Sequence, residues 1–118
     1  MSTYDKGKAG EQLAVSFLQQ RGYVIRKTNF YYQKAEIDII AQKDDVLCIV
    51  EVKWRHSAAF GAPFEFVTPK KRKLLARAAA FYIDQNQWQG ETRFDIISIT
   101  GEAQNPQIEH IEAAFYFF

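Results

Sequence analysis

The stretch EIDIIAQKDDVLCIVEVK, residues 36–53, constrains the fold more than any other part of this chain. Two apolar, β-branched runs flank the turn Lys43-Asp44-Asp45, which predicts strands over 36–42 and 46–54 joined as a hairpin. Carboxylates and an ammonium group stand at the outer ends of these strands, where a buried strand should be apolar. The pattern therefore predicts the centre of a sheet with a charged site at one end.

The register of this hairpin follows from its turn. A two-residue turn at Asp44-Asp45 would place Asp38 opposite Glu51. The same register would place Glu36 opposite Lys53. Opposed residues of an antiparallel pair share a face, so these four charged groups are predicted to lie together. The other face would then be entirely apolar, with Ile37, Ile39, Ala41, Cys48, Val50 and Val52. A slip of one residue would break this match, which supports the register.

The rest of the chain predicts two helices and three further strands. A helix is expected from Asp5 to about Arg21, with Gly22 as its stop signal, followed by a strand over 23–32. A second helix over 68–87 begins with Thr68 as N-cap and Pro69 at the first helical position. Residues 57–66 form a predicted loop, and strands are expected over 93–100 and 107–117. The order α-β-β-β-α-β-β predicts an α/β fold with a mixed central β-sheet flanked by helices.

Composition limits the class of protein. The 118 residues are expected to form one domain spanning 1–118, and 47% hydrophobic with 25% charged residues excludes a disordered or fibrous chain. The single cysteine, Cys48, excludes an intramolecular disulfide and a cysteine zinc motif, and we expect it in the core. No signal peptide and no apolar run of ~18 residues is present, so we expect a cytoplasmic protein without a membrane partner. A net charge of +1 does not indicate a nucleic-acid partner, so that question depends on how the charges are distributed.

The opposed carboxylates of the hairpin need a compensating charge. Asp38 and Glu51 at ~5 Å would repel each other unless a cation lies between them or one is protonated. Mg²⁺ suits this place because it takes oxygen ligands, often from only one or two carboxylates, and Mn²⁺ is the expected substitute. Lys53 would then orient the attacking water or stabilise charge on a phosphate. The alternative, which stays open, is a structural ion-pair cluster in which Lys53 neutralises Glu36.

The spacing of these residues resembles a known active site. Asp38 followed by Glu51-Val52-Lys53, with Glu11 on the preceding helix, resembles the PD-(D/E)xK nuclease superfamily, in particular its branch similar to archaeal Holliday-junction resolvases. The segments GKAGEQLAVSFLQQRGY, AEIDIIA, VEVKWR and RFDIISI, in this order, resemble the YraN family of small uncharacterised bacterial proteins over nearly the whole chain. The resemblance implies a restriction-endonuclease-like fold and Mg²⁺-dependent hydrolysis of DNA. It also implies metal ligands at Glu11, Asp38 and Glu51, with Lys53 assisting catalysis.

Two features outside the hairpin fit this interpretation. Glu11 lies on or beside the apolar face of its helix, where a carboxylate is costly unless it is paired or binds a cation. The alternative is that Glu11 stabilises the first turns through the helix dipole. Lys70, Lys71, Arg72 and Lys73 occupy the first turn of the second helix, where cations oppose the dipole unless an anion binds there. We expect Lys70, Lys71 and Arg72, with Arg55, to contact a nucleic-acid backbone, and a solvated charged face is the alternative.

Three functions remain open from the sequence. The first is an Mg²⁺-dependent endonuclease that acts on DNA, with branched or otherwise structured DNA as one candidate substrate; the sequence does not choose between branched and linear DNA. The others are a nucleic-acid-binding module without turnover on the same fold, and a protein-interaction scaffold. Symmetric cleavage of two strands would need a homodimer. The aromatic residues Phe115–Phe118 are expected either in the core or at such an interface.

Overall fold

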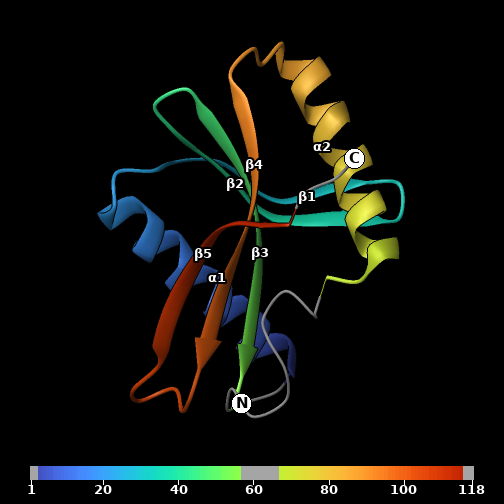
Figure 1. The fold of residues 1–118 in the computed structure, drawn as a ribbon. Helices are drawn as coiled ribbons and strands as arrows, with labels where there is room; N and C mark the ends of the chain where they lie inside the picture. Colours follow the sequence, from blue (N-terminus) through green and yellow to red (C-terminus); the bar gives the residue numbers. More distant parts are fainter. Residues whose placement is uncertain (1–2, 57–66, 116–118) are drawn as a thin grey trace.

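A computed structural model of the chain describes residues 3–56 and 67–115. Figure 1 shows the order of the elements along the chain. They are α1 (Thr3–Gln20), β1 (Val24–Tyr32), β2 (Ala35–Lys43), β3 (Val46–Arg55), α2 (Pro69–Asn86), β4 (Glu91–Thr100) and β5 (Gln107–Phe115). This order confirms the predicted α-β-β-β-α-β-β arrangement. The predicted loop over 57–66 and the last residues of the predicted C-terminal strand lie outside the described residues.

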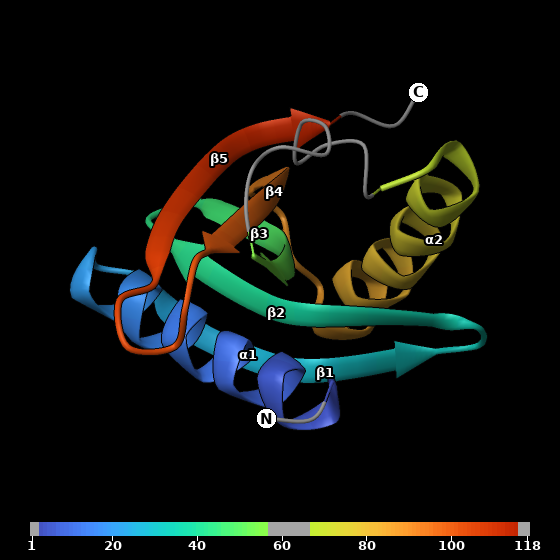
Figure 2. The ribbon, with the colours of Figure 1, turned by 90° about the horizontal axis from the view of Figure 1, so that it is seen from below.

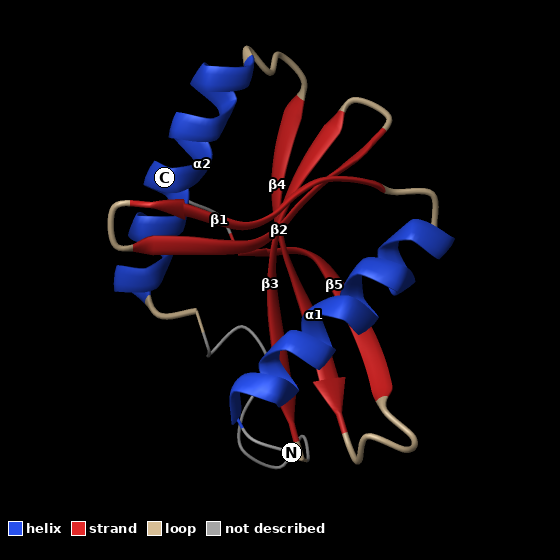
Figure 3. Cartoon of the chain, turned by 180° about the vertical axis from the view of Figure 1, so that it is seen from behind, coloured by secondary structure: helices blue, strands red, loops and turns tan. Residues whose placement is uncertain are grey.

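The strands form one mixed sheet. Its order is β1-β2-β3-β4-β5, and β3 pairs with β4 in parallel while the other neighbours are antiparallel. The parallel pair arises because α2 lies in the connection between β3 and β4, as a parallel crossover requires. Figures 2 and 3 show α1 and α2 on opposite faces of the sheet.

Both helices end or begin at the residues that the sequence indicates. The Tyr23 N–H donates to the Leu18 carbonyl at 3.0 Å, and Gly22 adopts φ 91°, a conformation that glycine tolerates and that closes α1. At the start of α2, the Thr68 hydroxyl accepts from the Lys71 N–H at 3.2 Å, which confirms Thr68 as the N-cap. Within the described part of the chain, neither helix combines the length and hydrophobicity needed to cross a membrane.

Two hydrophobic clusters cover the two faces of the sheet. One contains Leu18 of α1 together with Cys48 and Val50 of β3. The other contains Leu75 of α2 and the C-terminal Phe115. Cys48 is fully buried and Phe115 is almost so, which confirms both as core residues. Residues 116–118 are not described.

The hairpin keeps its predicted register only near its turn. Ile39 pairs with Val50, and the same register continues to the turn, as predicted. Pairing between β2 and β3 ends at Ile39, beyond which β2 continues beside β1 alone and diverges from β3 (Figure 1). The predicted opposition of Glu36 and Lys53 is therefore wrong.

The predicted continuous apolar face of the hairpin is also wrong. Ile39 packs in the α1 cluster, but Ile37 packs in the α2 cluster. Strict alternation would have placed both on one face, so the strand must rotate about its axis near Asp38, as strongly twisted strands do. The twist carries the far end of the β1–β2 hairpin across the sheet toward α2 (Figure 2). Asp38 therefore lies at the point where β2 separates from β3.

Candidate metal and nucleic-acid site

Asp38 and Glu51 meet at this point of separation. Their carboxyl groups are close enough to interact with each other, and the Val52 N–H donates to Asp38 Oδ2 at 2.8 Å. Burial, and then the interaction with the Glu51 carboxyl group and its negative charge, raise the pKa of Asp38 to about 8. Two carboxyl groups in contact must share a proton or have a cation between them. The structure thus brings together the central pair of predicted ligands, and their contact fits a cation-binding site.

A pocket of about 560 Å³ opens beside Asp38. Two of the predicted ligands line this pocket: Glu11, from α1, and Asp38, from β2. Glu51 lies outside the pocket lining and is 8% exposed. The polar or aromatic lining residues are Lys8, Glu11, Asn29, Tyr31, Glu36 and Asp38.

Glu11 is held in this pocket by a residue that the sequence interpretation missed. The Asn29 side-chain amide donates to Glu11 Oε1 at 2.6 Å. Burial and the negative charges of Asp38 and Glu36 raise the pKa of Glu11 against the opposing effect of the Asn29 bond. Asn29 also adopts φ 52°, a left-handed conformation that asparagine tolerates better than most residues. An asparagine inside a β-rich run is unusual, and this was the available signal.

Lys71 of α2 contacts the other predicted ligand. Its ammonium nitrogen lies 2.8 Å from Glu51 Oε2, and the Glu51 side chain is 9% exposed whereas that of Lys71 is 44% exposed. A lysine predicted to bind phosphate is thus an ion-pair partner of a predicted metal ligand. Spacing in the sequence does not reveal this contact, because it depends on how α2 packs against the end of β3.

The other predicted cations divide into two groups. Lys53 and Lys70 are exposed. Arg72 instead makes contacts within the protein. Its Nε donates to the Val67 carbonyl at 2.9 Å, and its guanidinium lies 5.7 Å from the centre of the Phe115 ring. Arg55 is half-buried near the end of β3, where its carbonyl accepts from the Gly101 N–H at 3.2 Å. Exposure therefore separates Lys53 and Lys70, which face solvent, from Arg72 and Arg55, which are partly buried.

The donor set fits a magnesium ion held by few protein ligands. Among the described residues, no group of three or more His, Cys, Asp or Glu side chains is close enough to hold a metal ion together. Mg²⁺ commonly uses one or two carboxylates and keeps several waters, and the Asp38–Glu51 pair meets that requirement. Glu11 lines the same pocket as Asp38, but its carboxylate accepts a hydrogen bond from Asn29. Of the three predicted ligands, Glu11 is therefore the one outside the Asp38–Glu51 pair.

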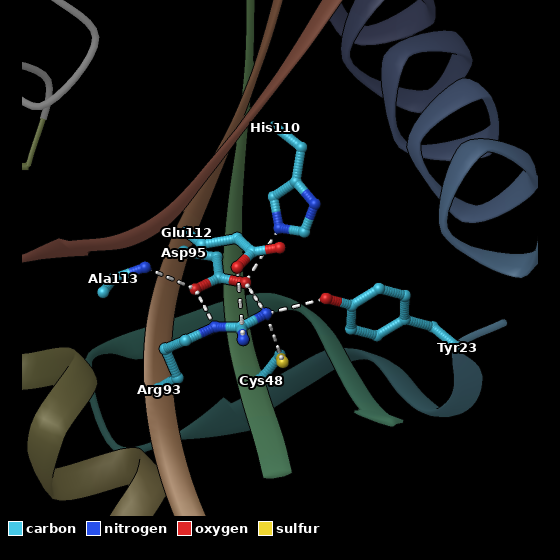
Figure 4. Close-up of polar contacts among 7 residues, drawn as sticks. All are labelled: Tyr23, Cys48, Arg93, Asp95, His110, Glu112 and Ala113. Atoms are coloured by element: carbon cyan, nitrogen blue, oxygen red, sulfur yellow. Dashed lines mark hydrogen bonds and ion pairs between the residues drawn. The ribbon is translucent and has the colours of Figure 1, made fainter. Parts of the chain in front are cut away.

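A second polar cluster, around Asp95 of β4, was not predicted (Figure 4). Asp95 is fully buried, and its carboxylate accepts from Arg93 Nε at 2.8 Å and from Arg93 Nη2 at 2.9 Å. His110 Nε2 lies 2.8 Å from Asp95 Oδ2, and the Ala113 N–H donates to Oδ1 at 3.0 Å. Burial alone would raise the pKa of Asp95, but the bonds from His110, Arg93 and Ala113 outweigh it and lower the pKa. The carboxylate is therefore held ionised inside the protein.

Arg93 extends this cluster across the sheet. Its Nη2 donates to the Tyr23 hydroxyl at 2.7 Å and to Cys48 Sγ at 3.2 Å. Burial raises the pKa of the Cys48 thiol to about 12, which keeps it protonated and excludes it as a nucleophile near neutral pH. The cluster therefore connects the start of β1 with β3, β4 and β5, and it acts as a structural clamp. The signal in the sequence was Arg93 and Asp95, two residues apart and so on one face of the strand predicted over 93–100.

Comparisons with known proteins extend over most of the chain. Residues 10–99 match the profile of the family described as "Uncharacterised protein family UPF0102". A UPF0102 protein of Flavobacterium psychrophilum is 54% identical over 114 residues, which cover 97% of this chain and 96% of the relative. A UPF0102 protein of Bacteroides thetaiotaomicron is 46% identical over 110 residues, covering 93% of this chain and 91% of the relative. One of Myxococcus xanthus is 36% identical over 110 residues, covering 92% and 87%.

Proposed function

The chain belongs to the UPF0102 family, and we propose that it is a metal-dependent endonuclease that hydrolyses phosphodiester bonds of DNA. Membership confirms the family-level assignment made from the sequence motifs. The nuclease interpretation is supported by the Glu11, Asp38 and Glu51-Val52-Lys53 pattern. The observation that carries it is the contact between the Asp38 and Glu51 carboxyl groups beside a pocket that also contains Glu11.

Each residue of the site has a distinct role in this proposal. Asp38 and Glu51 hold Mg²⁺ or Mn²⁺, with Glu11 as the third, outer carboxylate. When bound, the ion supplies Lewis-acid chemistry by lowering the pKa of a water and neutralising phosphate charge. Asn29 keeps the Glu11 carboxylate oriented into the pocket through its 2.6 Å bond. Lys53 stabilises negative charge on the phosphate, and the exposed Lys70 attracts the DNA backbone.

The form of the DNA and the oligomeric state belong to the same proposal. The substrate is branched or otherwise structured DNA, with linear duplex as the comparison substrate. Cleavage of both strands at symmetric positions requires two active sites related by a two-fold axis, which a homodimer would supply. Sedimentation of the protein with and without DNA distinguishes a constitutive dimer from one formed on the substrate.

Metal binding is the first test, because it needs no knowledge of the substrate. Calorimetry with Mn²⁺ and Mg²⁺ should detect binding to the wild type and none to Asp38→Asn. Asp44→Asn is the matched control, since Asp44 is exposed at the hairpin turn with φ 54°, which asparagine accepts. Equal binding by wild type and Asp38→Asn would contradict the assignment of Asp38 as a ligand.

Cleavage is the second test. With Mn²⁺ or Mg²⁺ present, Asp38→Asn should lose more than about 100-fold of the cleavage rate on DNA while its circular dichroism spectrum stays that of the wild type. Asp44→Asn should cleave normally. Undiminished cleavage by a folded Asp38→Asn protein would refute the proposed active site.

A DNA-binding module without turnover is the second candidate. It is favoured by the contacts of Glu51 with Lys71 and of Glu11 with Asn29, because these pairs satisfy the carboxylates without a metal. Such a module should bind DNA with affinity that falls steeply with salt. Lys70→Ala should reduce the slope of log affinity against log salt by about one if Lys70 contacts a phosphate. Affinity that is indifferent to salt would count against this candidate.

A further inference from the structure

The ammonium group of Lys71 lies beside Glu51, one of the two predicted metal ligands that are in contact, and this position affects how the site binds metal. Lys71 Nζ lies 2.8 Å from Glu51 Oε2, and the Glu51 side chain is 9% exposed. We propose that Lys71 is a built-in counter-ion that competes with the divalent cation for Glu51. The inference rests on the proposed function, because it takes Glu51 to be a metal ligand.

The fold explains why Lys71 is the basic residue in this place. Its backbone N–H is fixed in the first turn of α2 by the bond to the Thr68 hydroxyl, at 3.2 Å. A cation in a first helical turn is disfavoured by the helix dipole, and the Glu51 carboxylate compensates for this. Of the neighbouring cations, Lys70 is exposed and the Arg72 guanidinium is bonded to the Val67 carbonyl at 2.9 Å. Lys71 alone of these three contacts Glu51.

Competition follows from the charges. A metal that binds Glu51 comes within ~2.1 Å of a carboxylate oxygen, and the Lys71 ammonium is already 2.8 Å from one of the two oxygens. Either the ammonium leaves, which breaks an ion pair, or two cations share one carboxylate and repel each other. In both cases Lys71 lowers the affinity of the site for the metal. The pair also spares the protein a buried carboxylate without a counter-ion when no metal is bound.

The test removes the ammonium and measures metal affinity directly. Lys71→Met keeps an unbranched side chain as far as Cε and the backbone bond of Lys71, but not its ammonium group. Lys70→Met removes the same charge from an adjacent exposed position. By calorimetry, Lys71→Met should bind Mn²⁺ at least about fivefold more tightly than the wild type, as expected for loss of a competing ion pair. Lys70→Met should bind Mn²⁺ with the wild-type affinity, which excludes a general effect of net charge.

The outcomes separate this inference from the proposed function. Equal or weaker Mn²⁺ binding by Lys71→Met, with binding by the wild type intact, overturns the role of Lys71 and leaves the metal site standing. Absence of binding in both proteins overturns both proposals.

A measurement on the wild-type chain covers the case in which Lys71→Met does not fold. Lysines are labelled by reductive ¹³C-methylation, which keeps their charge, and the Lys71 signal is assigned from its loss in Lys71→Arg. Addition of Mg²⁺ should shift the Lys71 signal and leave that of Lys70 in place. A Lys71 signal that does not move up to the highest Mg²⁺ concentration contradicts the proposal.

Discussion

Replacement of Asp95 by asparagine tests the clamp that joins the strands behind the site. The change is nearly isosteric, so it removes charge with little change in volume. The Asp95 carboxylate accepts two bonds from Arg93 and one from the Ala113 N–H, and His110 Nε2 lies 2.8 Å from it. The introduced asparagine would be neutral, and its amide group would direct N–H donors toward a site that is surrounded by donors. Arg93 would then lose its buried counter-ion.

The magnitude follows from the burial of the pair. Removing one partner of a buried ion pair destabilises a protein by about 3–5 kcal/mol. Asp95 is fully buried, but the Arg93 side chain is 23% exposed and can recover some hydration, so we expect about 3 kcal/mol. For a chain of 118 residues this corresponds to a fall of roughly 10 °C in Tm. Glu112→Gln is the matched control, because Glu112 is 59% exposed and 3.6 Å from the same guanidinium. We expect it to change stability by less than ~1 kcal/mol.

Urea denaturation gives both free energies of unfolding, and its pH dependence checks the cause. The pKa of Asp95 is lowered in the folded protein, so its contribution is fully present above its unfolded pKa and is lost as pH falls through the lower, folded value. The difference in stability between wild type and Asp95→Asn should therefore begin to shrink below about pH 4, near the ordinary aspartate pKa of 3.8. A loss under ~1 kcal/mol at neutral pH, or a difference that persists unchanged in acid, would refute the account of the clamp.

Three other perturbations test separate parts of the structure. A Cβ added at Gly90 would overlap the Asp45 carbonyl oxygen at the hairpin turn. Gly90→Ala should therefore lower the free energy of unfolding, measured by urea denaturation, by about 1–3 kcal/mol. An unchanged free energy of unfolding would contradict that close approach. Thr68→Ala removes the cap of α2 and should cost about 1 kcal/mol in the same assay, whereas Thr68→Ser should retain most of it. In EDTA, where no divalent metal is bound, Asp38→Asn should raise the free energy of unfolding by about 0.5–2 kcal/mol, because it removes a carboxylate from contact with Glu51. A lower free energy of unfolding would show that the Asp38–Glu51 pair stabilises the fold.

Much of the fold could be predicted from local chemistry. Periodicity, the stop at Gly22, and the cap and proline at Thr68 and Pro69 predicted the helices, and alternating residues predicted the strands. The register of the hairpin near its turn also followed from the sequence, because a slip would have moved apolar residues to the wrong face. These features depend on residues within a few positions of each other.

The candidate site could be predicted only in part. The sequence motif predicted that Asp38 and Glu51 lie together as metal ligands, and their carboxyl groups are in contact in the fold. The predicted extension to Glu36 opposite Lys53 was wrong, because it assumed an untwisted hairpin whereas β2 separates from β3 beyond Ile39. The Asn29 bond to Glu11 was missed because it joins residues 18 positions apart through the packing of α1 on β1.

The sequence by itself determined which segments become helices and strands, since these depend on propensities, caps and periods that act over one or two turns. Beyond the Asp38–Glu51 pair, only the tertiary structure decided which polar groups meet. Lys71 reaches Glu51, and Arg93 reaches Tyr23 across 70 residues of sequence, because of the sheet order, the strand twist and the angles at which the helices pack. A local pattern can require that a buried charge has a partner, but the identity of that partner depends on distances that exist only after the chain has folded.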